Sequence, residues 1–160
     1  MAPGAIRTLS SGEQDLARGV FGAALDTKRI RLFALPWWSR AFVAGGRFMI
    51  WPARSALRDF ATASLSLRAT FVHELTHVWQ AQTGVNLLTA KLRAGDSDKA
   101  YGYDLSTAVD FANLNIEQQA MIIEHAYLAS VGGTAPYDSR AYADILATWP
   151  GSDFVNPQQV

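Results

Sequence analysis

The pattern of hydrophobic and polar positions predicts one helix and then two strands in the first third of the chain. Apolar side chains recur at helical spacing over residues 11–25, and Ser10 and Glu13 have the spacing of a capping box at the start of that helix. Residues 29–33 alternate between polar and apolar, and residues 47–51 form a short apolar run, as strands do. The loop between the two stretches predicts that they pair as a hairpin in a small sheet.

A long helix is predicted next. Ser64 or Ser66 can cap it, and Gly84 lies where a left-handed residue would end it. Its spacing leaves His73, His77 and Gln80 on one side, while a second set of residues faces the core: Leu65, Val72, Leu75, Val78 and Trp79.

The last third of the chain predicts a polar loop followed by two helices. Residues 91–110 are rich in glycine, serine and aspartate, which favours a long loop with at most a short helix. Asn115 and Gln118 have the spacing of a second capping box, and a short last helix is predicted over residues 138–149. We expect the tail after residue 151 to be loose. Helices and a small sheet together indicate an α+β fold.

Length, charge and composition narrow the class of protein. A chain of 160 residues can bury a core of its own, and we expect one domain over residues 1–160. The 14 basic and 14 acidic side chains cancel, so net charge gives no reason to expect nucleic acid or a membrane as a partner. The chain has no cysteine, which excludes disulfides and thiolate ligands. The N-terminus lacks a signal-peptide pattern, so we expect a cytoplasmic protein as encoded, unless a dedicated secretion system exports it.

The strongest chemical signal is the run His73-Glu74-Leu75-Thr76-His77, an H-E-x-x-H motif inside the long predicted helix. Residues four apart lie on the same face of a helix, so His73 and His77 can bind one metal ion together. Two such imidazoles with an adjacent glutamate are typical of a catalytic zinc site, in which Glu74 acts as general base on a metal-bound water. The motif therefore predicts one Zn²⁺ ion.

A catalytic zinc site needs a third protein ligand. The only later histidine, His125, does not have the spacing that follows the second motif histidine in metzincins, and two glutamates remain, Glu117 and Glu124. Glu117 begins an E-x-x-A sequence whose small Ala120 would let two helices pack closely, so we expect Glu117 to be the ligand. Glu124 lies on the same face about 10 Å further along the helix, and both cannot bind the ion directly.

Other polar residues are candidates for supporting roles. Glu124 can orient a ligating histidine or contact a substrate amine, although a solvated surface carboxylate is equally common. Four side chains could donate to the oxyanion of peptide hydrolysis, although a buried structural role is commoner for each tyrosine: His125, Tyr101, Tyr103 and Tyr127. The free edge of the strand at residues 47–51 could pair with an extended peptide.

The H-E-x-x-H motif followed by E-x-x-A resembles the gluzincin clan of zinc metallopeptidases in its smallest form. More closely, residues 71–80, 115–120 and 20–26 are similar to a family of small uncharacterised bacterial proteins, so the resemblance covers most of the chain. Some members of that family carry the label "Vgr-related", after the spike of type VI secretion.

This resemblance implies a fold, a site and a partner. The fold is a minimal zincin-like α+β domain, with a small antiparallel sheet packed on the motif helix and on a helix that carries the glutamate. The resemblance implies His73, His77 and Glu117 as zinc ligands and Glu74 as general base. It also implies an association with type VI secretion, without naming a substrate.

We therefore expect a zinc-dependent metallopeptidase that acts on a peptide or protein substrate. The alternative is a non-catalytic zinc-binding scaffold, or a secretion-associated accessory protein with a zincin fold. Glu74 favours the enzyme, because a structural site has no need for a glutamate after His73. A third interpretation has no metal, with both histidines satisfied inside the core.

Overall fold

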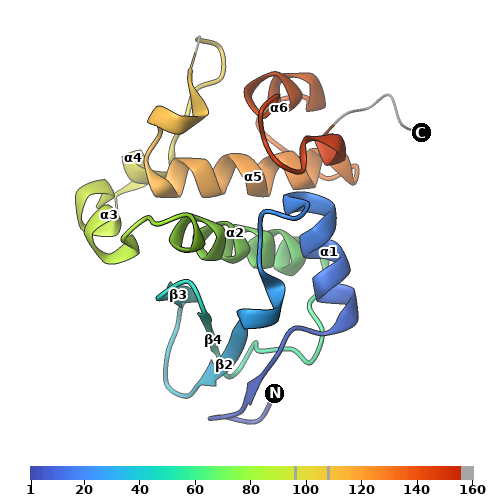
Figure 1. The fold of residues 1–160 in the computed structure, drawn as a ribbon, viewed down its shortest axis with the longest axis vertical. Helices are drawn as coiled ribbons and strands as arrows, with labels where there is room; N and C mark the ends of the chain where they lie inside the picture. The colour runs from blue at the N-terminus through green and yellow to red at the C-terminus, as the bar shows by residue number, and fades with distance from the viewer. Residues whose placement is uncertain (96, 108, 156–160) are drawn as a thin grey trace.

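The computed structural model describes residues 1–95, 97–107 and 109–155 and has an α+β fold, as expected (Figure 1). In chain order the elements are β1 (Ile6–Arg7), α1 (Ser11–Phe21), the 3-10 helix η1 (Thr27–Arg29), β2 (Arg31–Leu35), β3 (Phe42–Ala44), β4 (Phe48–Pro52), α2 (Leu65–Gln82), α3 (Leu87–Ala94), α4 (Asp98–Tyr101), η2 (Phe111–Asn113), α5 (Ile116–Ser130), α6 (Ser139–Ile145) and η3 (Ser152–Val155). The sheet lies on one side of α2, and α5 lies on the other side.

The sheet is mixed, with the strand order β1-β2-β4-β3. The predicted hairpin between residues 29–33 and 47–51 is wrong, because β2 pairs with β4 in parallel, with Arg31 opposite Phe48. The hairpin forms one strand later, between β3 and β4. Gly45 and Gly46 both have left-handed φ, at 60° and 63°, and supply the tight turn there. Because β4 is flanked by β2 and β3, the free edge expected at residues 47–51 belongs to β3 instead.

The first helix is correctly predicted at its start and too long at its end. Ser10 and Glu13 form the expected capping box. The helix ends at Phe21 rather than near residue 25, because Gly22 takes a left-handed φ of 57°. A Cβ at Gly22 would lie 2.8 Å from the carbonyl oxygen of Pro150, so the chain needs glycine at this position.

The two long helices form the centre of the molecule and run antiparallel (Figure 1). On α2 the predicted core residues Val72, Leu75 and Val78 are fully buried, while Leu65 and Trp79 are half-buried. The second capping box is also confirmed at the start of α5. Among the described residues, none of the helices has the length and apolar character needed to cross a membrane.

The stretch predicted at residues 91–110 as a long loop with room for a short helix does contain such a helix, α4. It also contains the end of α3, which was not expected. The predicted last helix does begin after Asp138, whose side chain caps α6, but it ends at Ile145 rather than near residue 149.

The C-terminal tail is also more structured than expected, up to residue 155. The indole Nε1 of Trp149 donates to the carbonyl of Val20 at 2.7 Å. Beyond it, η3 packs against the core through the buried side chain of Val155. The prediction of a loose tail is therefore wrong for residues 152–155, and residues 156–160 lie outside the described part.

One buried carboxylate joins three segments of the N-terminal half. Glu13 is 0% exposed and accepts hydrogen bonds from both Nη atoms of Arg7 at 2.6 Å. It also accepts from the backbone N–H groups of Ser10 and Phe60, each at 2.8 Å. The capping residue thus holds β1, α1 and the segment that leads to α2 together.

We expect Glu13→Gln to lower the free energy of unfolding by about 3 kcal/mol, measured by urea denaturation. The amide leaves the partly buried Arg7 without a counter-charge and turns NH₂ protons toward other donors. The control is Asp15→Asn, which removes a surface pair with Arg18 in which both side chains are 68% exposed. That change should cost less than about 0.5 kcal/mol. Equal losses for the two variants would contradict the role given to Glu13.

Candidate metal centre

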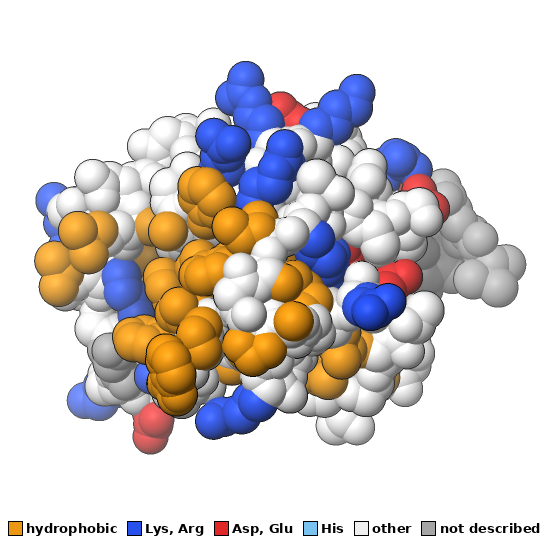
Figure 2. Space-filling model, turned by 90° about the horizontal axis from the view of Figure 1, so that it is seen from below, with side chains coloured by type: hydrophobic (Ala, Val, Ile, Leu, Met, Phe, Trp, Pro, Cys, Tyr) orange, Lys and Arg blue, Asp and Glu red, His pale blue; other side chains and the backbone are white. Residues whose placement is uncertain are grey.

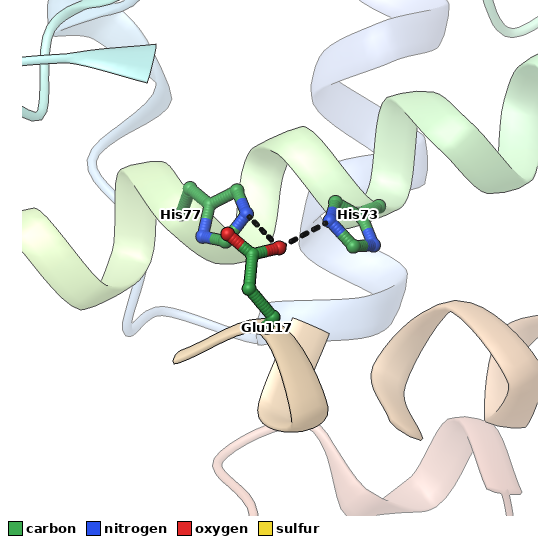
Figure 3. Close-up of side chains that lie close together, drawn as sticks. All are labelled: His73, His77 and Glu117. Atoms are coloured by element: carbon green, nitrogen blue, oxygen red, sulfur yellow. Dashed lines mark ion pairs between the residues drawn. The ribbon is translucent and has the colours of Figure 1, made fainter. Parts of the chain in front are cut away.

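Three side chains that could hold a metal ion meet between α2 and α5. The Oε2 atom of Glu117 lies 3.5 Å from Nε2 of His73 and 3.4 Å from Nε2 of His77 (Figure 3). The three ligand atoms all lie within 4.8 Å of one another. The residues are at most 9% exposed. The structure therefore brings together the three side chains that the sequence proposed as ligands.

The packing of the two helices sets this geometry. His73 and His77 are one turn apart on α2, and Glu117 is in the first turn of α5, where the Asn115 cap begins the helix. The side-chain amide of Gln80 donates to the carbonyl of Ile116 at 3.0 Å and so links α2 to the N-terminus of α5. The small Ala120, fully buried on α5, is consistent with the close approach of the helices.

Each histidine has a partner on its other nitrogen. Nδ1 of His77 lies 2.8 Å from Oε1 of Gln80, which can only accept, so this nitrogen donates to Gln80 and Nε2 is the nitrogen left to face a metal ion. Nδ1 of His73 lies 3.0 Å from Oε2 of Glu124. Glu124 thus contacts a motif histidine, one of the two roles expected of it. Gln80 was expected on the same side of the helix as the histidines, but its contact with His77 three residues earlier was not predicted.

The buried charges shift one another's pKa. Burial acts to lower the pKa of His73, but hydrogen bonds to Glu117 and Glu124 outweigh it and raise that pKa to about 9. Burial acts to raise the pKa of Glu117, but the imidazoles of His73 and His77 and the ammonium of Lys91 hold it well below its usual range. Without a metal ion, the site therefore keeps a proton on His73 at neutral pH.

Glu74 lies beside the three residues and is 6% exposed. Burial raises the pKa of its carboxyl group, and the two motif histidines only partly oppose this. Within the described part of the chain, its Oε2 atom has no hydrogen-bond partner. A buried oxygen without a partner costs free energy, so this atom is suited to accept a proton or hydrogen bond from a molecule that enters the cleft.

Lys91 is a further contact that the sequence did not indicate. Its Nζ atom donates to Oε1 of Glu117 at 2.8 Å and to the hydroxyl of Tyr101 at 2.7 Å. One oxygen of Glu117 thus faces the imidazoles and the other faces the ammonium group. Lys91 is on α3, 26 residues before Glu117, so no local spacing could have paired them.

The site opens into a cleft of about 990 Å³ that is lined by His73, Glu74, His77 and Glu117. Of the residues expected to support catalysis, Glu124 and Tyr101 also line this cleft. Apolar side chains from β3, α3 and the segments before them form its walls: Trp38, Phe42, Val85, Leu87 and Leu88.

The other candidate donors lie elsewhere. Tyr103 and His125 line a neighbouring hollow, where the Tyr103 hydroxyl lies 2.5 Å from Nδ1 of His125 and 2.8 Å from the Tyr142 hydroxyl. Tyr127 is buried on α5 and is not among the residues that line the cleft. Of the four expected donors, Tyr101 is thus the one that lines the cleft with the motif residues.

The chain is similar in sequence and in fold to a bacterial secretion protein. No family model matches the chain. The chain is 34% identical over 157 residues to the type VI secretion system spike protein VgrG2b of Pseudomonas aeruginosa, a match that covers 90% of this chain and 15% of that protein. The solved effector domain of Pseudomonas aeruginosa VgrG2b is similar in fold, with a TM-score of 0.69 and 30% identity over 89% of this chain and 83% of that one. The chain belongs to the family of the VgrG2b effector domain.

Proposed function

We propose that this chain is a type VI secretion-associated effector domain that binds one zinc ion through His73, His77 and Glu117. The family relationship supports the association with secretion. The observation that carries the metal site is the convergence of three ligand atoms within 4.8 Å beside an open cleft. Residues 1–160 form a single zincin-like domain in this proposal, and the secretion apparatus exports it from the cytoplasm.

The donor set fits zinc better than a harder ion. Two imidazole nitrogens and one carboxylate are ligands that zinc prefers, whereas magnesium and calcium prefer oxygen alone. Three protein ligands with an open side are the arrangement of catalytic rather than structural zinc sites. The contacts of Gln80 to His77 and of Glu124 to His73 are the supporting hydrogen bonds that metal-bound histidines usually have.

We further propose that the domain is a gluzincin-type metallopeptidase. Bound zinc would polarise a peptide carbonyl and acidify a water molecule. Glu74 Oε2 takes the proton of that water and delivers it to the leaving amine, for which its burial and raised pKa suit it. Tyr101 can donate its hydroxyl proton to the carbonyl oxygen from the wall of the cleft, while Lys91 keeps the second oxygen of Glu117 occupied.

A non-catalytic, secretion-associated zinc-binding protein is the second candidate. The likeness to the effector domain of a secretion spike protein supports this candidate more directly than it supports peptide hydrolysis, because it concerns secretion. Glu74 favours the enzyme, because a buried oxygen without a partner serves no purpose in a purely structural site. The experiments below separate the two.

We expect His77→Ala and Glu117→Ala to weaken zinc binding by roughly 100-fold or more, because each removes one of three ligands. Competition with a chromophoric chelator measures the affinity. The matched control is Glu74→Gln, which changes a neighbouring buried carboxylate that is not a ligand and should stay within about tenfold of the native affinity. A Glu117→Ala protein that binds zinc as tightly as the native chain would exclude the proposed ligand set.

We expect Glu74→Gln to reduce peptide cleavage by at least about 100-fold with unchanged zinc content, because it removes the general base and keeps the ligands. Cleavage of a peptide library, read by mass spectrometry, measures the activity. Asp15→Asn, on the exposed face of α1, is the control and should cleave like the native chain. Equal cleavage by native and Glu74→Gln protein would refute the mechanism. A native protein that holds zinc and cleaves no peptide would favour the non-catalytic candidate.

Zinc affinity should rise about tenfold per pH unit between pH 7 and the His73 pKa of about 9 and then level off, because zinc must displace the His73 proton. The stability of the metal-free protein should instead fall as the pH rises. A pKa raised from 6.5 adds stability that is fully present below pH 6.5 and is lost as the pH rises through about 9. Calorimetry in buffers of different ionisation enthalpy should detect about one released proton at pH 7.5.

The control for this pH dependence is Glu124→Gln. It removes a carboxylate that raises the His73 pKa and should flatten the rise in zinc affinity above neutral pH. An affinity that is constant from pH 7 to pH 9 in the native protein would contradict a protonated His73.

A further inference from the structure

The loop between β2 and β3 presents an unusual tryptophan. Trp37 is 100% exposed and has a φ of +57°. Among the described residues it is the one non-glycine with positive φ. A bulky side chain disfavours this conformation, and full exposure gives it no packing in return. Neither property stabilises the fold, so both point to a binding role for the loop.

Trp37 is next in the chain to Trp38, which lines the cleft together with other exposed apolar side chains. Trp38 is 49% exposed, and its ring lies 5.7 Å from that of Phe42, which is 37% exposed. On α3, Leu88 also lines the cleft and is 73% exposed, and Leu92, one helical turn further on, is 76% exposed. Because Trp38, Phe42 and Leu88 all line the same cleft, these side chains border one opening. We name these five residues the apolar rim.

Basic residues accompany the apolar rim. Residues 27–58, which include β2, β3 and β4, contain no aspartate or glutamate and hold half of the chain's 14 basic residues: Lys28, Arg29, Arg31, Arg40, Arg47, Arg54 and Arg58. All of these except the half-buried Arg31 are exposed. Seen from the side of the sheet, Figure 2 shows hydrophobic side chains gathered on one face, with more Lys and Arg than Asp and Glu around them. Although the net charge of the chain is zero, this face of the molecule is basic.

We propose that this face binds the surface of an anionic lipid bilayer. Trp37 and Trp38 then lie among the headgroups, where tryptophan is enriched because it is both apolar and able to donate a hydrogen bond. Arg40, Arg47 and Arg54 contact lipid phosphates. The exposed side chains of Leu88 and Leu92 can be buried against acyl chains, which lowers their free energy. A nucleic acid or an acidic polymer has no apolar region that could bury them.

This inference concerns a surface and does not depend on zinc or on peptide hydrolysis. If the domain binds both zinc and the bilayer, the cleft opens toward the bilayer, because Trp38, Phe42 and Leu88 line the cleft. The strain at Trp37 is then a cost in the free protein that the bound state offsets.

Sedimentation of the full chain with phosphatidylcholine vesicles, with and without phosphatidylglycerol, tests the proposal. The native protein should sediment with the anionic vesicles. Trp37→Ala with Trp38→Ala should lower the partition coefficient at least about tenfold. Glutamine at Arg40, Arg47 and Arg54 together should lower it roughly 100-fold on anionic vesicles.

Two control variants lie outside the apolar rim. Val131→Ala removes an apolar side chain that is 46% exposed at the end of α5, and Arg140→Gln removes an exposed arginine of α6. Both should bind the vesicles like the native chain. Failure of the native chain to sediment with anionic vesicles overturns the proposal. The proposal is also overturned if the arginine substitutions abolish sedimentation and the tryptophan substitutions leave it unchanged. That result would indicate a general site for polyanions.

Trp37→Gly tests the strain by a separate measurement. Glycine adopts positive φ without penalty, so the urea midpoint of unfolding should rise while vesicle binding falls. A Trp37→Gly protein that is more stable and binds vesicles less well would support a role of the Trp37 side chain in membrane binding. A lower midpoint means that Trp37 serves the fold, and it contradicts the proposal.

Discussion

The antiparallel packing of α2 on α5 is the contact on which the site depends. It places Glu117, in the first turn of one helix, opposite the two histidines of the other. Gln80 secures the arrangement, because one side chain accepts from His77 and donates to the start of α5. Since the site spans two helices, a small change in their separation would move the carboxylate away from both imidazoles. The precision of the site is therefore a property of core packing.

Burial of several carboxylates in one place gives the site its chemical character. Glu74 and Glu117 are both nearly inaccessible, and Glu124 contacts His73. Such a cluster is costly unless positive charge compensates it. In the metal-free protein the compensation comes from a proton on His73 and from Lys91. A site that needs positive charge to be stable is predisposed to bind a cation.

The sheet contributes the wall of the cleft rather than the chemistry. The exposed edge strand β3 and the loop before it carry aromatic side chains, and the wider stretch of residues 27–58 carries half of the basic residues. The long helices contribute the buried acidic groups. Exposed basic side chains thus gather on the sheet side, while the carboxylates of Glu74 and Glu117 are buried beside the histidines. A net charge of zero conceals this division.

The sequence by itself determined the features that depend on neighbours within about four residues. The spacing of His73 and His77 and the caps at Ser10 and Asn115 follow from helix geometry and appear as expected. Glu117 could be chosen because few glutamates remained to choose from.

Only the tertiary structure decided the rest. The parallel pairing of β2 with β4, the contact of Lys91 with Glu117 and the separation of Tyr103 from the cleft join residues far apart in the chain. Such contacts depend on how whole elements pack, and the energy of packing is spread over many side chains. Local periodicity therefore carries no record of them.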